Sequence, residues 1–370
     1  MNKYLIAGVL GVGCLYAATS MWSHRVHQRE HAQHNFDVAA ARDKKNIIDI
    51  AAIGSGPAAL TACVYGCRAG RQVVCFSGSE PGGLLKKTTL VENWPGEISI
   101  QGPEIIRRLW AQAEAFGTHF IPEDVVETDF STYPYRLKTH SGLEFYAFSV
   151  IVATGATPKK LGIPGEETYW GNGVSTCAVC DGSLTKGQNV VVVGGGDSAI
   201  EEAIQLAPYA QSITIMVRGE SMRAAQSMQD RLVQYPSITV RYNVSIQEIV
   251  GDDQGVTGIV VRDNKTGVVT QEPIFAVFLA IGHIPNIWML GDQLELSKTG
   301  HILLCDHTQT SVTGVFAAGD VADARYRQAG VAAGDGIKAA LDADRFLVEI
   351  GYSQAVAREF DNIRFSPVGH

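Results

Sequence analysis

Residues 47–60 of this chain read I-I-D-I-A-A-I-G-S-G-P-A-A-L, an apolar run that ends in a glycine turn. The run predicts a buried strand, and the residues after the turn predict a helix followed by a second strand at 73–76. A strand, a glycine turn, a helix and a strand in this order form a dinucleotide-binding unit. In such a unit Gly54 permits the tight turn, and Gly56 lets the backbone approach a pyrophosphate.

Residues 189–202 read N-V-V-V-V-G-G-G-D-S-A-I-E-E and repeat the same pattern. Gly194 and Gly196 follow a valine strand and precede a predicted helix, and a further apolar strand is predicted at 212–217. The sequence therefore predicts two dinucleotide-binding units in one chain.

The residue that closes the strand after such a helix meets the adenosine ribose of the nucleotide. An acid there selects NAD, whereas arginine accommodates the extra phosphate of NADP. This chain has Arg218 at that point and Arg223 five residues later. The arginines favour NADPH, but Glu220 lies between them and leaves NADH open.

Residues 175–182 read S-T-C-A-V-C-D-G, with two cysteines two residues apart. Such a pair can be half of a zinc site, a structural staple or a redox-active dithiol. A zinc site needs two further ligands, and Cys305 with His301 and His307 beside it is only a weak candidate to supply them. We therefore expect no metal. Beside two dinucleotide units, the pair fits a redox dithiol fed by a flavin and a nicotinamide.

Composition limits the remaining classes. The 370 residues are 46% hydrophobic, which is enough for two or more packed domains. The formal net charge is −8 and the isoelectric point is about 5.7, so the chain does not have the basic character of a nucleic-acid binder.

The N-terminus predicts a membrane segment. Residues 5–22 are almost continuously apolar, and at ~1.5 Å per residue they span roughly 27 Å, enough to cross a bilayer core. Small residues at 17–20 leave a cleaved signal peptide as the alternative. Arginines and lysines follow the run, so the positive-inside rule favours an uncleaved anchor in the inner membrane with the following domains in the cytoplasm. A cytoplasmic protein without an anchor is the other alternative.

Residues 23–46 form a polar linker, in which His24, His27, His31 and His34 would align on one face of a helix. A solvated basic helix near lipid headgroups explains them better than a metal site or a pH sensor does.

Ten short motifs now occur in a fixed order. They are I-G-S-G-P-A-A-L (53–60), G-S-E-P-G-G-L-L (78–85), V-E-N-W-P-G (91–96), A-T-G-A (153–156), L-G-I-P-G-E (161–166), G-V-S-T-C-A-V-C-D-G (173–182), V-G-G-G-D-S-A-I-E-E-A (193–203), A-I-G-H-I-P-N (280–286), V-F-A-A-G-D-V (315–321) and Y-R-Q-A (326–329). From about residue 47 to about 348, the chain resembles a bacterial-type, low-molecular-weight thioredoxin reductase. One of these motifs would be weak evidence, whereas ten in order are highly specific.

The resemblance implies an α/β fold with two Rossmann-like dinucleotide-binding domains of the three-layer ββα type. An NADPH domain at 158–287 would be inserted into a discontinuous FAD domain at 47–157 and 288–370. The implied function is NADPH-dependent thioredoxin-disulfide reductase, with FAD as cofactor and a thioredoxin-like protein as partner. Members of the family are commonly homodimers.

The resemblance also implies site residues. Those expected to bind FAD are Gly54, Gly56, Pro57, Ala58, Gly78, Ser79, Glu80, Pro81, Gly82, Gly83, Leu84, Leu85, Asn93, Gly155, Gly319, Asp320, Arg327, Gln328 and Ala329. Those expected to bind NADPH are Gly194, Gly196, Asp197, Ser198, Ala199, Glu202, Arg218, Arg223, Ile281 and Gly282.

Three catalytic roles follow from the resemblance. Cys180 would face the flavin, Cys177 would attack the disulfide of the substrate, and Asp181 would protonate the departing thiolate. On spacing alone, Asp181 could also be a helix N-cap. In the family the NADPH domain rotates as a body, which places hinges near 155–160 and 284–290.

Two departures from the family pattern affect the cofactor sites. The loop at 78–85 usually carries glutamine where this chain has Leu84, so one polar flavin contact is missing. The usual phosphate-binding pattern H-R-R-x-x-x-R reads V-R-G-E-S-M-R here, so Gly219 replaces an arginine. This replacement should weaken binding of the 2′-phosphate.

Two other functions remain open. A flavin-dependent dithiol oxidase of the same fold would keep the cysteines but would not need Arg218 or the second glycine turn. A membrane-tethered scaffold that has lost redox activity is the other, although the intact cysteines and both glycine turns argue against it.

Overall fold

The computed structural model describes residues 43–88, 90–360, 362 and 364–366. The predicted membrane segment at 5–22 and the row of four histidines lie outside these residues. Within the described part of the chain, no helix has both the length and the apolar character needed to cross a bilayer.

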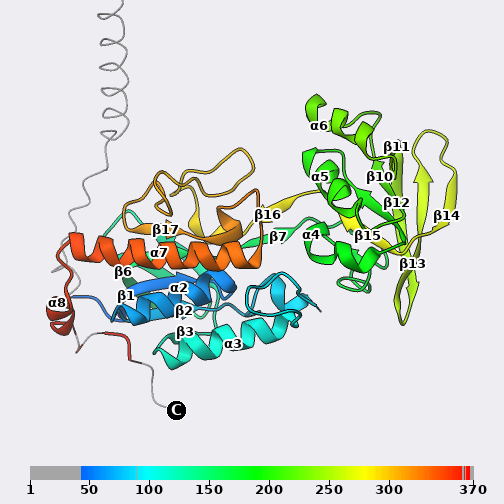
Figure 1. Ribbon diagram of the computed structural model, residues 1–370. Coiled ribbons are helices and arrows are strands. Elements are labelled where there is room, and N and C mark those ends of the chain that lie inside the picture. The colour runs from blue at the N-terminus through cyan, green and yellow to red at the C-terminus, as the bar shows by residue number, and fades with distance from the viewer. Residues whose placement is uncertain (1–42, 89, 361, 363, 367–370) are drawn as a thin grey trace, which may run out of the picture.

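A seven-stranded sheet forms the first unit, with the order β3-β2-β1-β6-β5-β4 and β17 paired to β6. Its strands are β1 (Ile47–Ile53), β2 (Val73–Phe76), β3 (His119–Ile121), β4 (Val125–Asp129), β5 (Tyr135–Thr139), β6 (Glu144–Val152) and β17 (Val315–Ala317). β1 is buried along its whole length, as its continuous apolar run predicts for a central parallel strand. Helices α2 (Pro57–Arg68), α3 (Gly102–Ala115) and α7 (Ala329–Glu349) cover one face of this sheet (Figure 1).

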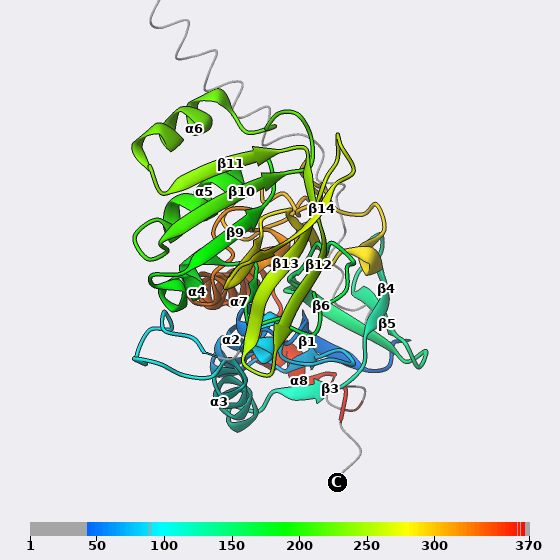
Figure 2. The ribbon, with the colours of Figure 1, turned by 90° about the vertical axis from the view of Figure 1, so that its right-hand side faces the viewer.

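The second unit has three layers. A parallel sheet, in the order β11-β10-β9-β15-β8, forms the middle layer. Its strands are β8 (Val174–Ser175), β9 (Asn189–Val193), β10 (Ser212–Val217), β11 (Ile238–Tyr242) and β15 (Ala276–Leu279). The helices α4 (Ala178–Asp181), α5 (Asp197–Leu206) and α6 (Gln226–Arg231) belong to one outer layer. The antiparallel strands β12 (Val244–Asp252), β13 (Gly255–Asp263) and β14 (Val269–Pro273) form the other (Figure 2). The predicted α/β class with two Rossmann-like units is confirmed.

Both glycine turns place backbone where no side chain would fit. A Cβ added to Gly54, whose φ is +121°, would lie 2.2 Å from the carbonyl oxygen of Ala153. A Cβ on Gly194, with φ +156°, would lie 2.5 Å from the carbonyl oxygen of Ala280. Each turn thus packs against the end of a neighbouring parallel strand, β6 for Gly54 and β15 for Gly194. Only glycine allows this close approach.

Two short strands join the units. β7 (Ala156–Pro158) and β16 (His283–Pro285) pair antiparallel to each other and lie between the two units (Figure 1). The Asn286 amide donates to the carbonyl of Gly155 over 3.0 Å, and the Thr154 hydroxyl donates to the carbonyl of Asn286 over 2.6 Å. The two chain crossings are therefore tied to each other, at the positions predicted for the hinges.

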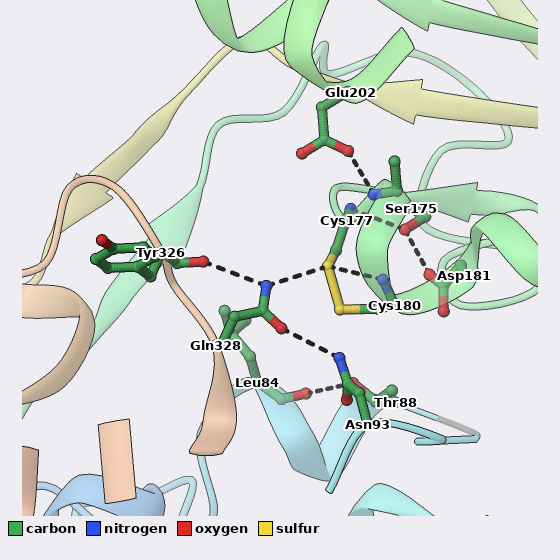
Figure 3. Close-up of a disulfide and its surroundings, with 11 residues drawn as sticks. Leu84, Thr88, Asn93, Ser175, Cys177, Cys180, Asp181, Glu202, Tyr326 and Gln328 are labelled. Atoms are coloured by element: carbon green, nitrogen blue, oxygen red, sulfur yellow. Dashed lines mark hydrogen bonds between the residues drawn. A yellow bond between two sulfur atoms is a disulfide. The ribbon is translucent and has the colours of Figure 1, made fainter. Parts of the chain in front are cut away.

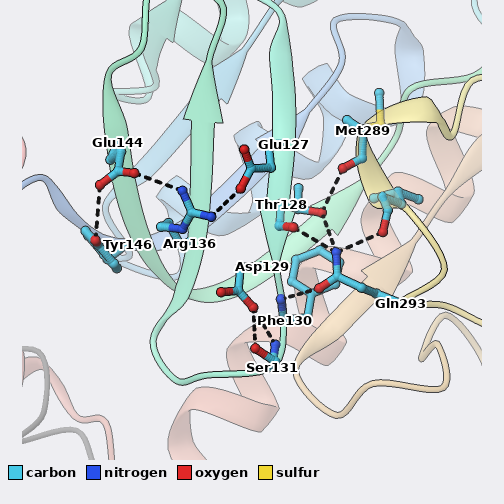
Figure 4. A network of polar contacts seen from close by, with 11 residues as sticks. Glu127, Thr128, Asp129, Phe130, Ser131, Arg136, Glu144, Tyr146, Met289 and Gln293 are labelled. Atoms are coloured by element: carbon cyan, nitrogen blue, oxygen red, sulfur yellow. Dashed lines mark hydrogen bonds and ion pairs between the residues drawn. The ribbon is translucent and has the colours of Figure 1, made fainter.

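After the second crossing the chain returns to the first sheet. Gln293 fastens it there, because its side-chain oxygen accepts from the Phe130 amide over 2.6 Å and its nitrogen donates to the carbonyl of Thr128 over 2.8 Å (Figure 4). The Thr128 hydroxyl also donates to the carbonyl of Met289 over 3.1 Å. This polar network thus joins β4 to a segment more than 160 positions later in the chain.

The C-terminal arm, which includes α8 (Gln354–Arg358), packs against the start of β1. Tyr352 and Phe360 are 0% and 1% exposed, and the Tyr352 hydroxyl donates to the buried Asp49 carboxylate over 2.7 Å. Arg364 pairs with the same carboxylate oxygen of Asp49, and the Gln72 amide donates to the other oxygen of Asp49 over 2.8 Å. The arm thus supplies the charge partner that a buried carboxylate needs.

Replacing Phe360 with alanine should therefore destabilise the first unit. Removing a fully buried ring leaves a cavity, and we expect the free energy of unfolding to fall by about 3–5 kcal/mol. Urea unfolding followed by circular dichroism measures the change. Arg358→Ala, at an exposed position in α8, should change it by less than about 0.5 kcal/mol. Similar losses in the two variants would contradict the packing of the arm.

Candidate active site

A cavity of about 800 Å³ opens beside the first glycine turn. Of the residues predicted to bind FAD, those that line it are Gly54, Gly56, Pro57, Ala58, Gly78, Ser79, Glu80, Gly83, Leu84, Leu85, Asn93, Gly155, Gly319, Asp320, Arg327, Gln328 and Ala329. Pro81 and Gly82 are not among the lining residues. Segments from both ends of the chain therefore meet around one space.

The first glycine turn leaves this space open at the N-terminus of α2. No atom lies within 4 Å of the position that a Cβ on Gly56 would take, and no side chain caps the helix there. Its first backbone N–H groups therefore remain available to a phosphate, which the helix dipole also favours. Ser55 holds the neighbouring loop, since its hydroxyl accepts from the Gly82 amide over 3.0 Å.

The C-terminal wall of the cavity carries a partly buried acid and a strained arginine. Burial raises the pKa of the Asp320 carboxyl to about 6. Arg327 adopts a positive φ of 47°, which is uncommon for a residue with a side chain, and its amide donates to Asp323 over 2.9 Å. Its guanidinium donates to Nδ1 of His283 in β16 over 2.5 Å. Burial, followed by the Arg327 charge, lowers the pKa of His283 to about 4, so a neutral imidazole accepts this bond.

Cys177 and Cys180 form a disulfide on the wall of the same cavity. Cys177 is the N-cap of α4, and its sulfur accepts from the Cys180 amide over 3.2 Å. From the first unit, the Gln328 side-chain amide approaches this sulfur at 3.8 Å and accepts from Asn93 over 3.1 Å (Figure 3). A disulfide that belongs to the second unit thus faces the cavity of the first.

Asp181 lies one residue beyond this disulfide and is linked back to it through Ser175. The Ser175 hydroxyl donates to the Asp181 carboxylate over 2.5 Å and accepts from the Cys177 amide over 3.0 Å. Burial raises the pKa of Asp181, and the hydrogen bond from Ser175 opposes this rise. The side chain of Asp181 therefore does not serve as an N-cap here, since its partner is a hydroxyl group.

Glu202 is the one predicted NADPH residue that lines the cavity of the first unit. Its carboxylate extends from α5 and accepts from the Ala178 amide in the first turn of α4. Burial raises its pKa to about 7, while the bond from Ala178 and the charge of Arg327 oppose the rise. Glu202 thus supports the first turn of the helix that carries Cys180, from within the second unit.

The other predicted NADPH residues gather around the second glycine turn, outside the cavity. Here too, the Cβ position of Gly196 faces open space at the N-terminus of α5. The Arg223 amide donates to the carbonyl of Gly195 over 2.6 Å, and the Asp197 carboxylate accepts from Ala225 over 2.8 Å. The loop that carries Arg218 and Arg223 is thus fastened beside this turn.

Sequence reasoning missed Ser175, His283 and Ser55. Ser175 stands in the dithiol motif, but only the folded loop turns its hydroxyl towards Asp181.

Among the described residues, no group of three or more histidine, cysteine or acidic side chains could hold a metal ion. The thiol of Cys305 donates instead to the carbonyl of Thr310 over 3.0 Å.

Glu202 generates a pH prediction. Its pKa rises from an ordinary value near 4.5 to about 7 in the folded protein, so ionisation at higher pH costs folded-state stability. Stability should therefore fall as the pH rises from about 4.5 through 7. Glu202→Gln removes this ionisation and keeps an acceptor for Ala178, so its melting temperature should gain on that of the wild type between pH 5 and pH 8. Glu201→Gln, at an exposed neighbour, is the control. Parallel melting curves for wild type and Glu202→Gln would contradict the prediction.

The sequence model of the pyridine nucleotide-disulphide oxidoreductases matches residues 48–336. The thioredoxin reductase of Streptomyces clavuligerus is 44% identical over 318 residues, which cover 85% of this chain and 98% of that protein. The NADPH-dependent thioredoxin reductase 3 of Arabidopsis thaliana is 44% identical over 81% of this chain, which spans only 58% of that longer protein. The structure of thioredoxin reductase from Giardia duodenalis superposes with a TM-score of 0.79 at 41% identity, over 82% of this chain and all of that one.

Proposed function

The chain belongs to the thioredoxin reductases of the pyridine nucleotide-disulphide oxidoreductase family, and we propose that it reduces the disulfide of a thioredoxin-like protein with electrons from NADPH. It is an oxidoreductase whose cofactors are FAD and NADPH. The observation that carries the proposal is the Cys177–Cys180 disulfide on the wall of the cavity beside the first glycine turn.

We assign FAD to this cavity, and two features of the cavity fit it. The open N-terminus of α2 at Gly56 suits a pyrophosphate, because its free N–H groups and its dipole both attract negative charge. The partly buried Asp320 carboxyl suits the hydroxyl groups of a ribityl chain, which would satisfy its oxygens. Leu84 lines the cavity with an apolar side chain, in agreement with the loss of one polar contact.

We assign NADPH to the second glycine turn. Gly196 and the N-terminus of α5 would hold its pyrophosphate, as Gly56 and α2 would hold that of FAD in the first unit. Arg218 and Arg223 would hold the 2′-phosphate.

The chemistry that bound FAD would supply is acceptance of a hydride from NADPH and transfer of the electron pair to a disulfide. Opening of the Cys177–Cys180 bond takes up these two electrons. With one proton it gives a thiol and a thiolate, and with two protons it gives two thiols. We assign Cys180 to the flavin side and Cys177 to the attack on the partner. The Cys177 thiolate forms a mixed disulfide and displaces one partner sulfur as a thiolate. Attack by Cys180 on Cys177 then restores the internal disulfide and releases the second partner sulfur.

The raised pKa of Asp181 suits it to protonate a displaced thiolate, because a carboxyl that binds a proton more tightly can hold it nearer neutral pH. Ser175 orients this carboxyl through its 2.5 Å hydrogen bond. Asp181 would thus act as the acid–base group, and Ser175 would position it.

We propose that the disulfide meets a protein partner only after the two units change their relative orientation, because here it faces the cavity of the first unit. We propose that residues 158–287 form the moving NADPH domain and that 47–157 and 288–370 form the FAD domain. Rotation about β7 and β16 would bring the dithiol out of the cavity and would admit the nicotinamide.

Cys180→Ser should separate the two halves of the reaction. The variant cannot form the internal disulfide, so NADPH-driven reduction of added thioredoxin should fall by more than about a hundredfold. NADPH should still bleach the yellow flavin absorbance under anaerobic conditions. Stopped-flow absorbance and a dithiol reporter measure the two steps, and Cys305→Ser should keep both. Loss of flavin bleaching in Cys180→Ser would contradict the proposed order of electron transfer.

We further propose that residues 5–22 anchor the protein in the inner membrane with its catalytic domains in the cytoplasm. The long apolar run and the basic residues after it support this. The full chain should sediment with membranes and resist extraction by carbonate, whereas a variant that begins at residue 43 should remain in the supernatant. Recovery of the full chain in the supernatant would refute the anchor.

A homodimer is proposed from the family resemblance, and the molar mass of the shortened variant by light scattering tests it.

A further inference from the structure

The loop after β10 carries fewer cations than the usual 2′-phosphate site. Gly219 stands where family members have arginine, and Glu220 follows it directly. Arg218, Gly219 and Glu220 are all exposed. A carboxylate at this place would repel a phosphate and would suit the free hydroxyl of NADH instead. The fold must therefore offset Glu220 if the site is to prefer NADPH.

The turn between β13 and β14 lies beside this loop, near the ends of β10 and β11 (Figure 2). The Asn264 side chain donates to the carbonyl of Arg218 over 3.0 Å and to the Ser245 hydroxyl over 2.9 Å. The Asn243 amide donates to the carbonyl of Gly219 over 2.9 Å, and its own carbonyl accepts from the Asn264 amide over 2.7 Å. Three hydrogen bonds from Asn264 thus fix this turn in place, one of them directly to the loop, and the Asn243 amide fastens the loop a second time.

The turn is also rigid in itself. One oxygen of the Asp263 carboxylate accepts from the amides of Lys265 and Thr266, each over 2.8 Å. The Gly267 amide donates to the carbonyl of Asp263 over 2.8 Å. These bonds fix the backbone from which the Lys265 side chain extends.

Lys265 reaches the loop with its charge. Its ammonium nitrogen lies 3.0 Å from the Glu220 carboxylate, and the two side chains remain 60% and 76% exposed. An ion pair this exposed contributes at most about 1 kcal/mol to stability, so it does not explain the fold. Its effect is to bring a third cation to the loop that carries Arg218 and Arg223. With Glu220 included, the four side chains leave two positive charges, which match the roughly −1.5 to −2 of a phosphate monoester at pH 7.

We propose that Lys265 is a cofactor-specificity residue that binds the 2′-phosphate of NADPH and supplies the charge that Gly219 lacks. Glu220 holds the ammonium at the rim of the site, and the lysine turns to the phosphate when the nucleotide binds. This inference rests on the proposed use of NADPH. It extends the nucleotide site from the β10 loop to the antiparallel β12–β14 layer.

The test measures binding of two probes to the purified holoenzyme by isothermal titration calorimetry. Adenosine 2′,5′-bisphosphate carries the 2′-phosphate, and adenosine 5′-monophosphate lacks it. Lys265→Ala should weaken the bisphosphate about fivefold to tenfold and leave the monophosphate unchanged, because one charged contact to phosphate is lost. In turnover, KM for NADPH should rise by a similar factor while KM for NADH stays constant. Lys265→Arg should retain binding.

Lys338→Ala is the matched control. Lys338 is 63% exposed and pairs with Asp335 over 3.0 Å, so its removal deletes an equivalent ion pair from α7 in the first unit. This variant should bind both probes like the wild type.

A second background separates direct binding from simple neutralisation of Glu220. In Glu220→Gln, Lys265→Ala should still weaken the bisphosphate, because the lost contact is to the phosphate. No further loss there, or no loss in the wild-type background, would overturn the proposal. If the wild type binds both probes equally, the assignment of NADPH fails instead.

Discussion

The disulfide of Cys177 and Cys180 belongs by chain to the second unit and by position to the cavity of the first. The proposed reaction places two opposed requirements on this pair. The two units must lie against each other for the disulfide to take electrons from FAD in the cavity, and they must part for it to reach another protein. The two glycine turns, the two crossings and the polar groups around the disulfide all serve these opposed requirements.

With the two units in contact, acidic side chains from both units lie around one cavity, where their negative charges would repel one another. Asp181, Glu202 and Asp320 all have pKa values raised mainly by burial. Arg327 lies among them, and its charge lowers the pKa of Glu202 and of Asp320. The neutral imidazole of His283 accepts from Arg327 and so adds no further charge. The charge of Arg327 thus stabilises the ionised forms of an acid in each unit. The pKa of Glu202, beside the dithiol segment, therefore depends on the relative position of the two units.

Local patterns in the sequence were sufficient for the fold. Continuous apolar strands followed by glycine turns predict the parallel strands at the centre of both sheets, and the structure contains them. The predicted FAD residues mostly line one cavity, although their contacts with a cofactor remain a prediction. Long-range placement could not be predicted. The residue pairs Asn93–Gln328 and Asp49–Arg364 are 235 and 315 positions apart, and no periodicity indicates that they meet. Glu202 shows the same limit, because the charge of Arg327 reaches it from the other unit and depends on how the two units are oriented.

The side-chain contacts between the two units are weak enough for the proposed rotation to break them. Gln328 approaches the Cys177 sulfur at 3.8 Å, which is a long and weak hydrogen bond. Ser183 donates to Glu92 over 3.1 Å between two exposed side chains, where water can replace either partner. The bonds of Asn286, by contrast, lie within the crossing itself and can persist while the units turn. Strong bonds at the hinge and weak bonds between the units are what a rotating domain requires, since the axis must be kept while the contact face is exchanged.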